Sequence, residues 1–193
     1  TDNTSLPDLL GLMKGSLRAQ SGIVQFRGKT FSRANAKRGV ANGVAFIEEN
    51  PVQSMLFPQM TYLENLCFLV GEKANPLPLS RRVLKSVVQE YGPKIGADLY
   101  ETDLSNLRLQ ALYDLVYYRI QLCSPAAVFC VQPFAGADMY LRRHVIELIS
   151  RLKARGITVV IPSVNIADSL VIADRLLLLE KGRVLGDYPR SEF

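Results

Sequence analysis

The segment from Ala127 to Pro133 is the most informative part of this chain about its chemistry. The apolar run from Ala127 predicts a buried β-strand, and Pro133 predicts a turn directly after it. An acidic pair at such a strand end could bind Mg²⁺ with one carboxylate and orient a water on the γ-phosphate of a nucleotide with the other. Val131 and Gln132 occupy these two places. Neither side chain carries the charge that holds the metal ion or can accept the proton.

The cysteines and the single histidine form no pattern typical of a metal or catalytic site. Cys67, Cys123 and Cys130 are odd in number and widely spaced, without a CxxC or His/Cys cluster. We therefore expect reduced cysteines that pack as small hydrophobic residues, and no metal site. His144 follows two arginines in a helical stretch, and we expect it on a helix surface rather than as a catalytic base.

Length and composition predict one soluble globular domain. The chain has 193 residues, of which 48% are hydrophobic and 21% charged. The net charge of +5 comes from scattered basic residues, and no basic stripe with interleaved aromatics favours direct nucleic-acid binding. Charged residues flank the leucine run Leu176–Leu179, which is too short to span a membrane. The chain opens without a methionine or signal peptide, and we expect it to be part of a longer polypeptide.

The first two thirds of the chain predict a mixed beginning followed by a helical insert. The elements expected up to residue 49 are a helix over Leu9–Lys14, a hairpin of Ile23–Arg27 with Thr30–Phe31, a short helix over Ala34–Arg38 and a buried strand over Val44–Ile47. Prolines punctuate the next region, which has no clear strand signal. Its expected helices are Tyr62–Val70, Ser80–Tyr91 and Leu107–Leu122.

Strands and helices alternate in the last third. The expected elements are a strand over Val128–Val131, a helix over Met139–Ala154, a strand over Thr158–Ile161, a helix over Ala167–Ile172, a strand over Arg175–Leu179 and a last strand at Arg183–Leu185. Apolar strands separated by helices predict a parallel sheet covered on both faces. We therefore predict a three-layer α/β fold over residues 1–193, with a core of 1–49 and 123–193 and a helical subdomain at 50–122.

Three segments match one known family in order and separation. Gly22–Lys29 fits the hairpin SGxIxxxGK, Leu56–Leu66 fits LFPxMTVxENL, and Ile172–Val184 fits xADRxxxLxxGRV. On these segments the chain resembles the nucleotide-binding domain of ABC transporters, with the sugar importers as the most similar branch. The resemblance covers nearly the whole chain. It implies a P-loop NTPase-like fold, ATP and Mg²⁺ as the family's ligands, and a cytoplasmic place at the inner face of the membrane.

The resemblance also implies where the nucleotide-binding groups would lie. Counting back places the phosphate-binding loop on the first eight residues, with Leu6 at the position of its lysine and Pro7 at that of its hydroxyl residue. Residues 3–7 then form only a helix-capping loop. Val164 falls at the family's switch histidine. Glu49 falls near the glutamine loop, where sugar importers often carry a glutamate as well.

Two further motifs of the family are placed less uniquely. The signature motif falls on Leu107–Ala111 in a gapless count, which also puts Arg119 on an arginine usual in the following helix. A rival register uses Leu104–Arg108, and both registers lack the glycines that allow close backbone approach. Asp138 matches the D-loop, and it can equally be the N-cap of the helix after it.

On this resemblance, we expect the strand that precedes the phosphate-binding loop in the family to lie before the first residue of this sequence. In the family this strand is central to the sheet, and here Thr158–Ile161 and Arg175–Leu179 would flank the gap. We expect an upstream segment to fill the gap, or a rearrangement of the chain, or a swap between chains.

The substitutions predict a pseudo-ATPase with no catalytic residues and no bound cofactor. The lost groups supply positioned charge, on which phosphoryl transfer depends. We expect a structural or regulatory partner of a transport complex, bound to a membrane subunit, to a second nucleotide-binding domain or to a second copy. The candidate partner surface consists of Leu56, Phe57, Met60 and Tyr62, although these residues could equally be core of the helical subdomain.

Two alternatives remain open at this point. The chain could be a sensory or regulatory module of a longer protein with a fused effector, for example a DNA-binding domain. It could also be a weak ATP-binding subunit that borrows catalytic residues from a partner.

Overall fold

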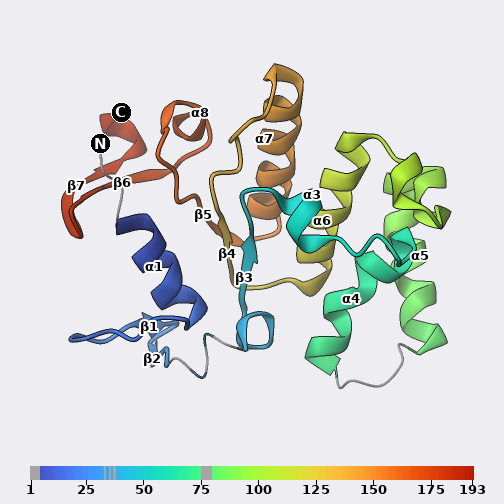
Figure 1. Ribbon diagram of the computed structural model, residues 1–193, viewed down its shortest axis with the longest axis horizontal. Coiled ribbons are helices and arrows are strands. Elements are labelled where there is room, and N and C mark those ends of the chain that lie inside the picture. Colours follow the sequence, from blue (N-terminus) through green and yellow to red (C-terminus); the bar gives the residue numbers. More distant parts are fainter. Residues whose placement is uncertain (1–4, 33, 35, 37, 75–79) are drawn as a thin grey trace.

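The computed structural model describes residues 5–32, 34, 36, 38–74 and 80–193, with the backbone alone at 71–74. Figure 1 shows a central sheet with a helical region on one side and a two-stranded ribbon on the other. None of the described helices combines the length and the apolar character needed to cross a membrane.

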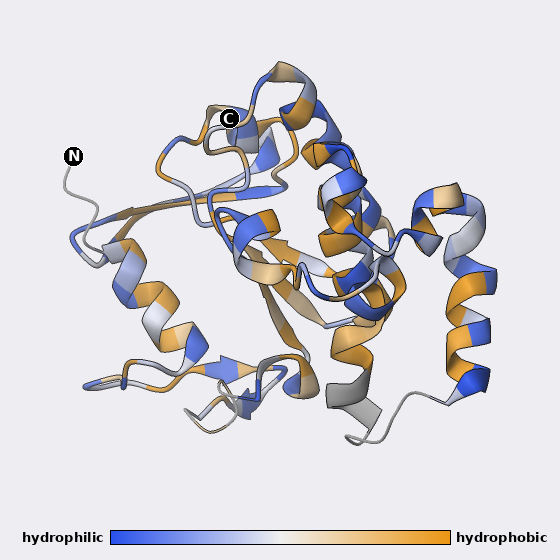
Figure 2. Cartoon of the chain, turned by 45° about the vertical axis from the view of Figure 1, so that its right-hand side comes forward, coloured by the Kyte–Doolittle hydropathy of each residue, from blue (hydrophilic) through white to orange (hydrophobic). Residues whose placement is uncertain are grey.

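The centre is a parallel three-stranded sheet in the order β3–β4–β5. Its strands are β3 (Val44–Ile47), β4 (Ala127–Cys130) and β5 (Thr158–Val160). The side chains of β3 and β4 are buried or half-buried, as expected for strands covered on both faces, and Figure 2 shows the central strands in the apolar colour. The predicted α/β class is therefore confirmed.

Alternate side chains of these strands enter two different apolar clusters. Val128 and Cys130 of β4 pack with α6 (Leu109–Cys123) and α7 (Met139–Ala154). Phe129 belongs to the other cluster and stacks on Phe46, with ring centroids 5.1 Å apart. Met13 of α1 (Ser5–Lys14) packs against this second cluster. Helix α1 and helices α6 and α7 thus cover opposite faces of the sheet.

The N-terminal elements differ in their limits from the predicted ones. Helix α1 begins at Ser5, four residues before the predicted start, so Pro7 lies in its first turn and not in a capping loop. Proline is compatible with this place because the first N–H groups of a helix have no intrahelical partner. The hairpin has two short strands, β1 (Gln25–Phe26) and β2 (Lys29–Thr30), and Arg27 is a turn residue with φ 53°. A 3₁₀ turn, η1 (Gly39–Asn42), precedes β3, and the helix predicted over Ala34–Arg38 falls partly outside the described residues.

The helical region lies between β3 and β4 along the chain. Its elements are α3 (Pro51–Met55), α4 (Tyr62–Ala74), α5 (Arg81–Ile95), the 3₁₀ turns η2 (Gly96–Tyr100) and η3 (Leu104–Asn106), and α6. Helix α5 continues through Pro93 to Ile95, four residues beyond the predicted end. Tyr91 of α5 and Val128 of β4 belong to one continuous apolar cluster. The helical region and the sheet therefore share a single core.

The C-terminal ribbon is separate from the central sheet. After α8 (Ala167–Leu170), strands β6 (Arg175–Glu180) and β7 (Arg183–Pro189) pair antiparallel, and the 3₁₀ turn η4 (Arg190–Glu192) follows. Within the described residues β5 pairs only with β4, and β6 only with β7. We predicted a gap between the strands now labelled β5 and β6, and a single sheet that paired them would have contradicted it. Among the described strands, β5 and β6 belong to separate sheets.

Candidate functional site

The carboxyl ends of the three central strands meet at Gln132. The backbone N–H of Gln132 donates to the oxygen of Pro162 after β5 at 3.0 Å, and Val131 N–H donates to Ile47 O of β3 at 2.8 Å. The side-chain amide of Gln132 donates to Glu49 Oε2 at 3.1 Å. Gln132 adopts φ 43°, a left-handed backbone that is uncommon for a residue other than glycine. The fold thus brings together Gln132 and Glu49, two residues predicted near a nucleotide site, and joins them by a hydrogen bond.

The other residues predicted at this edge of the sheet are Val131, Val164 and Asp138. Val131 is buried, whereas Val164 lies in the loop after β5 with 53% of its surface exposed. Asp138 caps α7, since its Oδ1 accepts the N–H of Leu141 at 2.8 Å. Of the two roles considered for Asp138, the N-cap is therefore observed, and the D-loop role stays a prediction.

The start of α1 is attached to the C-terminal ribbon. Ser5 Oγ accepts a hydrogen bond from the N–H of Gly182, in the turn between β6 and β7, at 2.7 Å. Leu6 is half-buried and Pro7 is exposed in the same helical turn. The remaining positions of the predicted phosphate loop, residues 1–4, lie outside the described residues.

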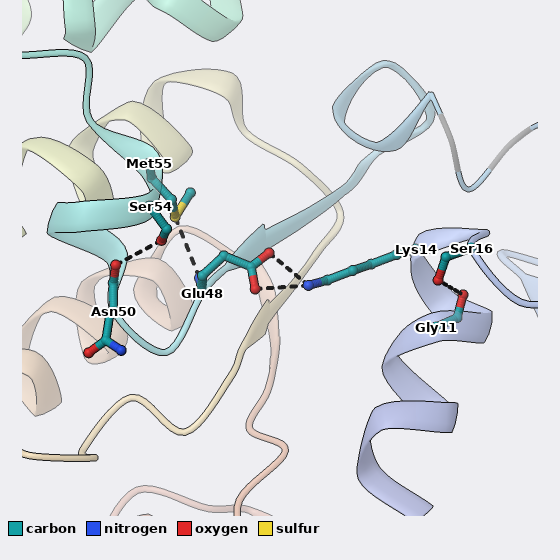
Figure 3. Close-up of polar contacts among 7 residues, drawn as sticks. All are labelled: Gly11, Lys14, Ser16, Glu48, Asn50, Ser54 and Met55. Atoms are coloured by element: carbon teal, nitrogen blue, oxygen red, sulfur yellow. Dashed lines mark hydrogen bonds and ion pairs between the residues drawn. The ribbon is translucent and has the colours of Figure 1, made fainter.

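The end of α1 is attached to the central sheet by an ion pair that the sequence did not suggest. Lys14 Nζ lies 2.8 Å from both carboxylate oxygens of Glu48, the first residue after β3 (Figure 3). The ammonium also lies 5.4 Å from the centre of the Phe46 ring. The N–H of Glu48 in turn approaches Met55 Sδ at 3.5 Å. Residues 34 positions apart meet here, and no local pattern indicates such a contact.

The Leu56–Leu66 segment is held by its own polar side chains. Asn65 is fully buried, accepts from the N–H of Phe57 at 2.9 Å and donates to the oxygens of Phe57, Met60 and Thr61. Thr61 and Glu64 form a capping box, in which each side chain bonds the backbone N–H of the other. The segment most similar to the family thus encodes a loop and the start of α4.

Two of the four residues predicted for a partner surface belong to the core instead. Tyr62 is 0% exposed and Leu56 is 8% exposed, because both point into the cluster beneath α4 and α6. Phe57 and Met60 are half-buried. Phe68 of α4 was not predicted, yet its ring lies 4.4 Å from that of Phe57 and it is 38% exposed. We call Phe57, Met60 and Phe68 the Phe57 surface.

Solved structures with the same architecture identify the fold. The chain superposes on cbiO1 from Clostridium perfringens, part of the ABC transporter complex cbiONQ, with a TM-score of 0.78 over 98% of this chain and 75% of that one, at 16% identity. It superposes on the ADP conformation of MJ1267, an ATP-binding cassette of an ABC transporter, with a TM-score of 0.77 over 96% and 76% of the two chains, at 21% identity. The chain has the fold of an ABC-transporter ATP-binding domain.

In sequence, the chain is similar to curated ATP-binding proteins of sugar importers. The ribose import ATP-binding protein RbsA of Clostridium perfringens strain SM101 is 22% identical over 182 residues, which are 92% of this chain and 36% of the relative. A putative ribose/galactose/methyl galactoside import ATP-binding protein of Pseudomonas syringae pv. tomato is 23% identical over 92% of this chain and 34% of the relative. The chain thus spans about a third of the length of these relatives. The predicted resemblance to sugar-import ABC ATPases is confirmed. No protein-family model matches the chain.

Within the ABC-type domain, both registers considered for the signature motif fall just before or at the start of α6. Leu104–Asn106 forms η3, and α6 begins at Leu109. Arg119, further along α6, is 2% exposed and donates through NH1 to the oxygen of Met55 at 2.7 Å. Burial lowers the pKa of this guanidinium to about 10. Its side chain therefore joins α6 to the end of α3, and the choice of register stays open.

Helices α6 and α7 of the ABC-type domain meet at a polar cluster. His144 Nε2 lies 3.1 Å from Asp114 Oδ1, and Arg151 donates to the hydroxyl of Tyr118 at 2.8 Å. Burial raises the pKa of the Asp114 carboxyl, and the neighbouring His144 and Arg151 oppose this shift. The prediction of a surface histidine was wrong, since the His144 side chain is only 20% exposed and faces α6.

The three cysteines behave as predicted. Cys67, Cys123 and Cys130 form no disulfide, and all three are buried. Burial raises the pKa of Cys67 to about 11 and that of Cys130 to about 12. Both thiols therefore stay protonated at neutral pH, the state in which a thiol is a poor nucleophile.

Proposed function

We propose that this ABC-type domain does not hydrolyse ATP and serves a transport complex as a structural or regulatory subunit. The contact between Gln132 and Glu49 carries the proposal. At the end of β4 an amide donates to the nearby carboxylate, where hydrolysis would need a second negative charge to orient water. An amide can neither accept a proton from water nor neutralise a metal ion.

The residues at the start of α1 support the same conclusion. Mg-ATP needs a cation for the β- and γ-phosphates and a hydroxyl for the metal ion. The resemblance puts Leu6 and Pro7 at these positions, and the hydroxyl of the adjacent Ser5 accepts a hydrogen bond from the N–H of Gly182. These residues do not fit Mg-ATP. Since phosphoryl transfer depends on positioned charge, the loss of several such groups together leaves no route to turnover.

The proposed partner is the membrane subunit of a transporter, contacted by the Phe57 surface at the inner face of the membrane. Phe57 is half-buried and Phe68 is 38% exposed, and because their rings already pack against each other they offer apolar area without much further loss of side-chain freedom. Asn65 holds the loop that carries Phe57 and Met60, so this surface is preformed.

Calorimetric titration with ATP, with and without Mg²⁺, tests the loss of nucleotide chemistry. We expect no saturable heat up to about 1 mM nucleotide, the affinity range at which binding free energy falls to about 4 kcal/mol. A coupled assay should detect no phosphate release from the native chain or from Gln132→Glu. That variant restores one carboxylate and leaves Leu6 and Pro7 in place. Turnover that persists at constant specific activity through a second purification step would overturn the proposal.

A further inference from the structure

The positive charge of the chain is concentrated in its N-terminal part rather than scattered. Residues 9–47 contain seven of the 23 basic residues and none of the 18 acidic ones. The rest of the chain therefore has more acidic than basic side chains, and the net charge of +5 arises from this segment. Charge of one sign on a limited surface creates a potential that attracts partners of the opposite sign.

The apolar side of this segment packs on the central sheet. Val24 and Phe26 of the hairpin and the following Phe31 join the cluster that contains Phe129 of β4. The rings of Phe26 and Phe31 meet edge to face, with their centroids 5.8 Å apart. Figure 1 shows the last turn of α1, the hairpin and η1 together at one end of the molecule. Phe26 and Phe31 thus face the sheet, which leaves the basic residues on the outside.

Most of the described basic residues of this segment are exposed and unpaired. Lys14 is paired with Glu48. Four others are exposed, and none of them lies within ion-pair distance of a carboxylate of the described residues: Arg18, Arg27, Lys29 and Arg38. Arg33 and Lys37 lie outside the described residues. The four exposed cations therefore contribute positive charge that no described neighbour neutralises.

The hairpin turn holds two of these cations close together. Arg27 and Gly28 form the two-residue connection between the paired residues Phe26 and Lys29, with φ of 53° and 71°. Positive φ at both central residues is typical of a type I′ turn, whose twist matches that of the flanking strands. The Arg27 guanidinium also lies 5.9 Å from the centre of the Phe26 ring. A tight turn thus presents Arg27 and Lys29 at the tip of the hairpin.

Exposed apolar side chains accompany the basic ones. Ile23, at the start of the hairpin, is 75% exposed, and Leu17, beside Arg18, is 44% exposed. Cations interspersed with apolar side chains suit the surface of an anionic bilayer, where the cations meet phosphates and the apolar groups enter the boundary of the acyl chains. A single-stranded nucleic acid would instead need exposed aromatic rings for base stacking, and Phe26 and Phe31 face inward.

We propose that this surface binds the anionic headgroups of a lipid bilayer. We call it the basic surface, and its members are Arg18, Ile23, Arg27, Lys29 and Arg38. Each basic side chain near such a bilayer strengthens binding about fivefold, so four of them together give a measurable affinity. The inference rests on the distribution of charge and of exposed apolar side chains. It depends neither on the loss of ATP hydrolysis nor on a membrane subunit.

Cosedimentation of the purified chain with vesicles tests the proposal. Vesicles of phosphatidylcholine alone are compared with vesicles that contain about 30% phosphatidylglycerol, an anionic lipid. We expect at least tenfold tighter binding to the anionic vesicles. Because salt screens exposed charges, this binding should weaken at least tenfold when the salt concentration rises from about 50 mM to about 300 mM.

Variants of equal charge separate the basic surface from the total charge of the chain. The double variant Arg27→Gln/Lys29→Gln should bind the anionic vesicles at least tenfold more weakly than the native chain. The matched control is Arg81→Gln/Arg82→Gln, which removes the same charge from two exposed residues at the start of α5. The control should bind within about twofold of the native chain, because α5 lies outside the basic surface.

Two single variants extend the test beyond the hairpin turn. Arg18→Gln, between α1 and β1, should weaken binding about fivefold. Ile23→Ser removes an exposed apolar side chain without a change in charge, so it should weaken binding while the salt dependence stays the same. All the replaced side chains are exposed, and circular dichroism confirms that each variant is folded.

Three results would overturn the proposal. Equal binding to neutral and anionic vesicles would remove the headgroup charge as the cause. An equal loss of binding in the two double variants would show that total charge, and not the basic surface, determines binding. Tighter binding to a nucleic-acid duplex than to anionic vesicles at the same phosphate concentration would make nucleic acid the partner of this surface.

Discussion

The guanidinium of Arg119 donates a hydrogen bond to the backbone oxygen of Met55, 64 residues earlier in the chain, across 2.7 Å. The side chain is 2% exposed, and its Nε and NH2 groups have no hydrogen-bond partner among the described residues. The contact joins the end of α3 to the middle of α6. It therefore fixes the segment between β3 and α4 on the helical region.

Replacement of Arg119 should separate the cost of losing this contact from the cost of burying the charge. Arg119→Ala leaves a cavity and an unpaired Met55 oxygen, and we expect a loss of about 3 kcal/mol in the free energy of unfolding. Arg119→Met fills the space without a buried charge, so its loss should be about 1 kcal/mol or less. Urea unfolding at pH 7 measures both. Equal losses for the two variants would contradict this assignment.

Removal of the Asn65 side chain should loosen the loop before α4. Asn65→Ala removes one accepted and three donated hydrogen bonds in a fully buried place, and we expect a loss of about 2–4 kcal/mol. Asn65→Asp retains the acceptor for Phe57 N–H but brings an unpaired charge, so it should cost at least as much. Chemical denaturation gives the loss. As a control, Ser54→Ala removes one exposed bond to Asn50 and should cost well under 1 kcal/mol.

The stability of the α6–α7 contact should depend on pH through Asp114. Its folded pKa is raised above 3.8, so the folded state holds the proton more tightly than the unfolded state. The stability that the protonated Asp114 carboxyl contributes is therefore lost as pH rises through its folded pKa. The charged or titratable groups around it are His144, Arg151, Asp98, Tyr118 and Tyr62.

Asp114→Asn removes this titration, so the stability of the native chain should fall relative to the variant as pH rises above 3.8. Thermal unfolding of both proteins from pH 3.5 to 7.5 gives the two curves. Glu147→Gln, at an exposed position of α7 that pairs with Arg143, serves as the control and should run parallel to the native chain. A stability difference between Asp114→Asn and the native chain that does not change with pH would exclude the titration of Asp114 as its cause.

The Phe57 surface should determine binding to a transporter membrane subunit. Phe57→Ala and Phe68→Ala each remove one ring of the packed aromatic pair, and we expect at least tenfold weaker association, about 1.4 kcal/mol. Association is measured with the membrane subunit in nanodiscs. Tyr100→Ala, at a residue that is 68% exposed on η2, is the matched control and should bind as the native chain does. Equal binding by all three variants would remove this surface from the proposal.

Local patterns were sufficient for most of the secondary structure and for several site residues. The apolar strand at Val128, the amphipathic stripe of α7 and the N-cap at Ser80 follow from side-chain period and capping chemistry. Errors arose where a short-range pattern was ambiguous. The hairpin turn takes Arg27 in a left-handed conformation, and α1 extends through Pro7, because the first turn of a helix tolerates proline.

The absence of a carboxylate at Val131 and Gln132 after β4, and of a basic residue at Leu6 in α1, can be read in the residues alone, since side-chain type sets which chemistry is available. The contacts between residues far apart in the chain could not be predicted from side-chain type. The pairs Gln132 with Glu49 and His144 with Asp114, and the burial of Tyr62, depend on packing between segments far apart along the chain. Periodicity reports which face of an element is apolar and says nothing of the element that covers it. Only the assembled fold decides that.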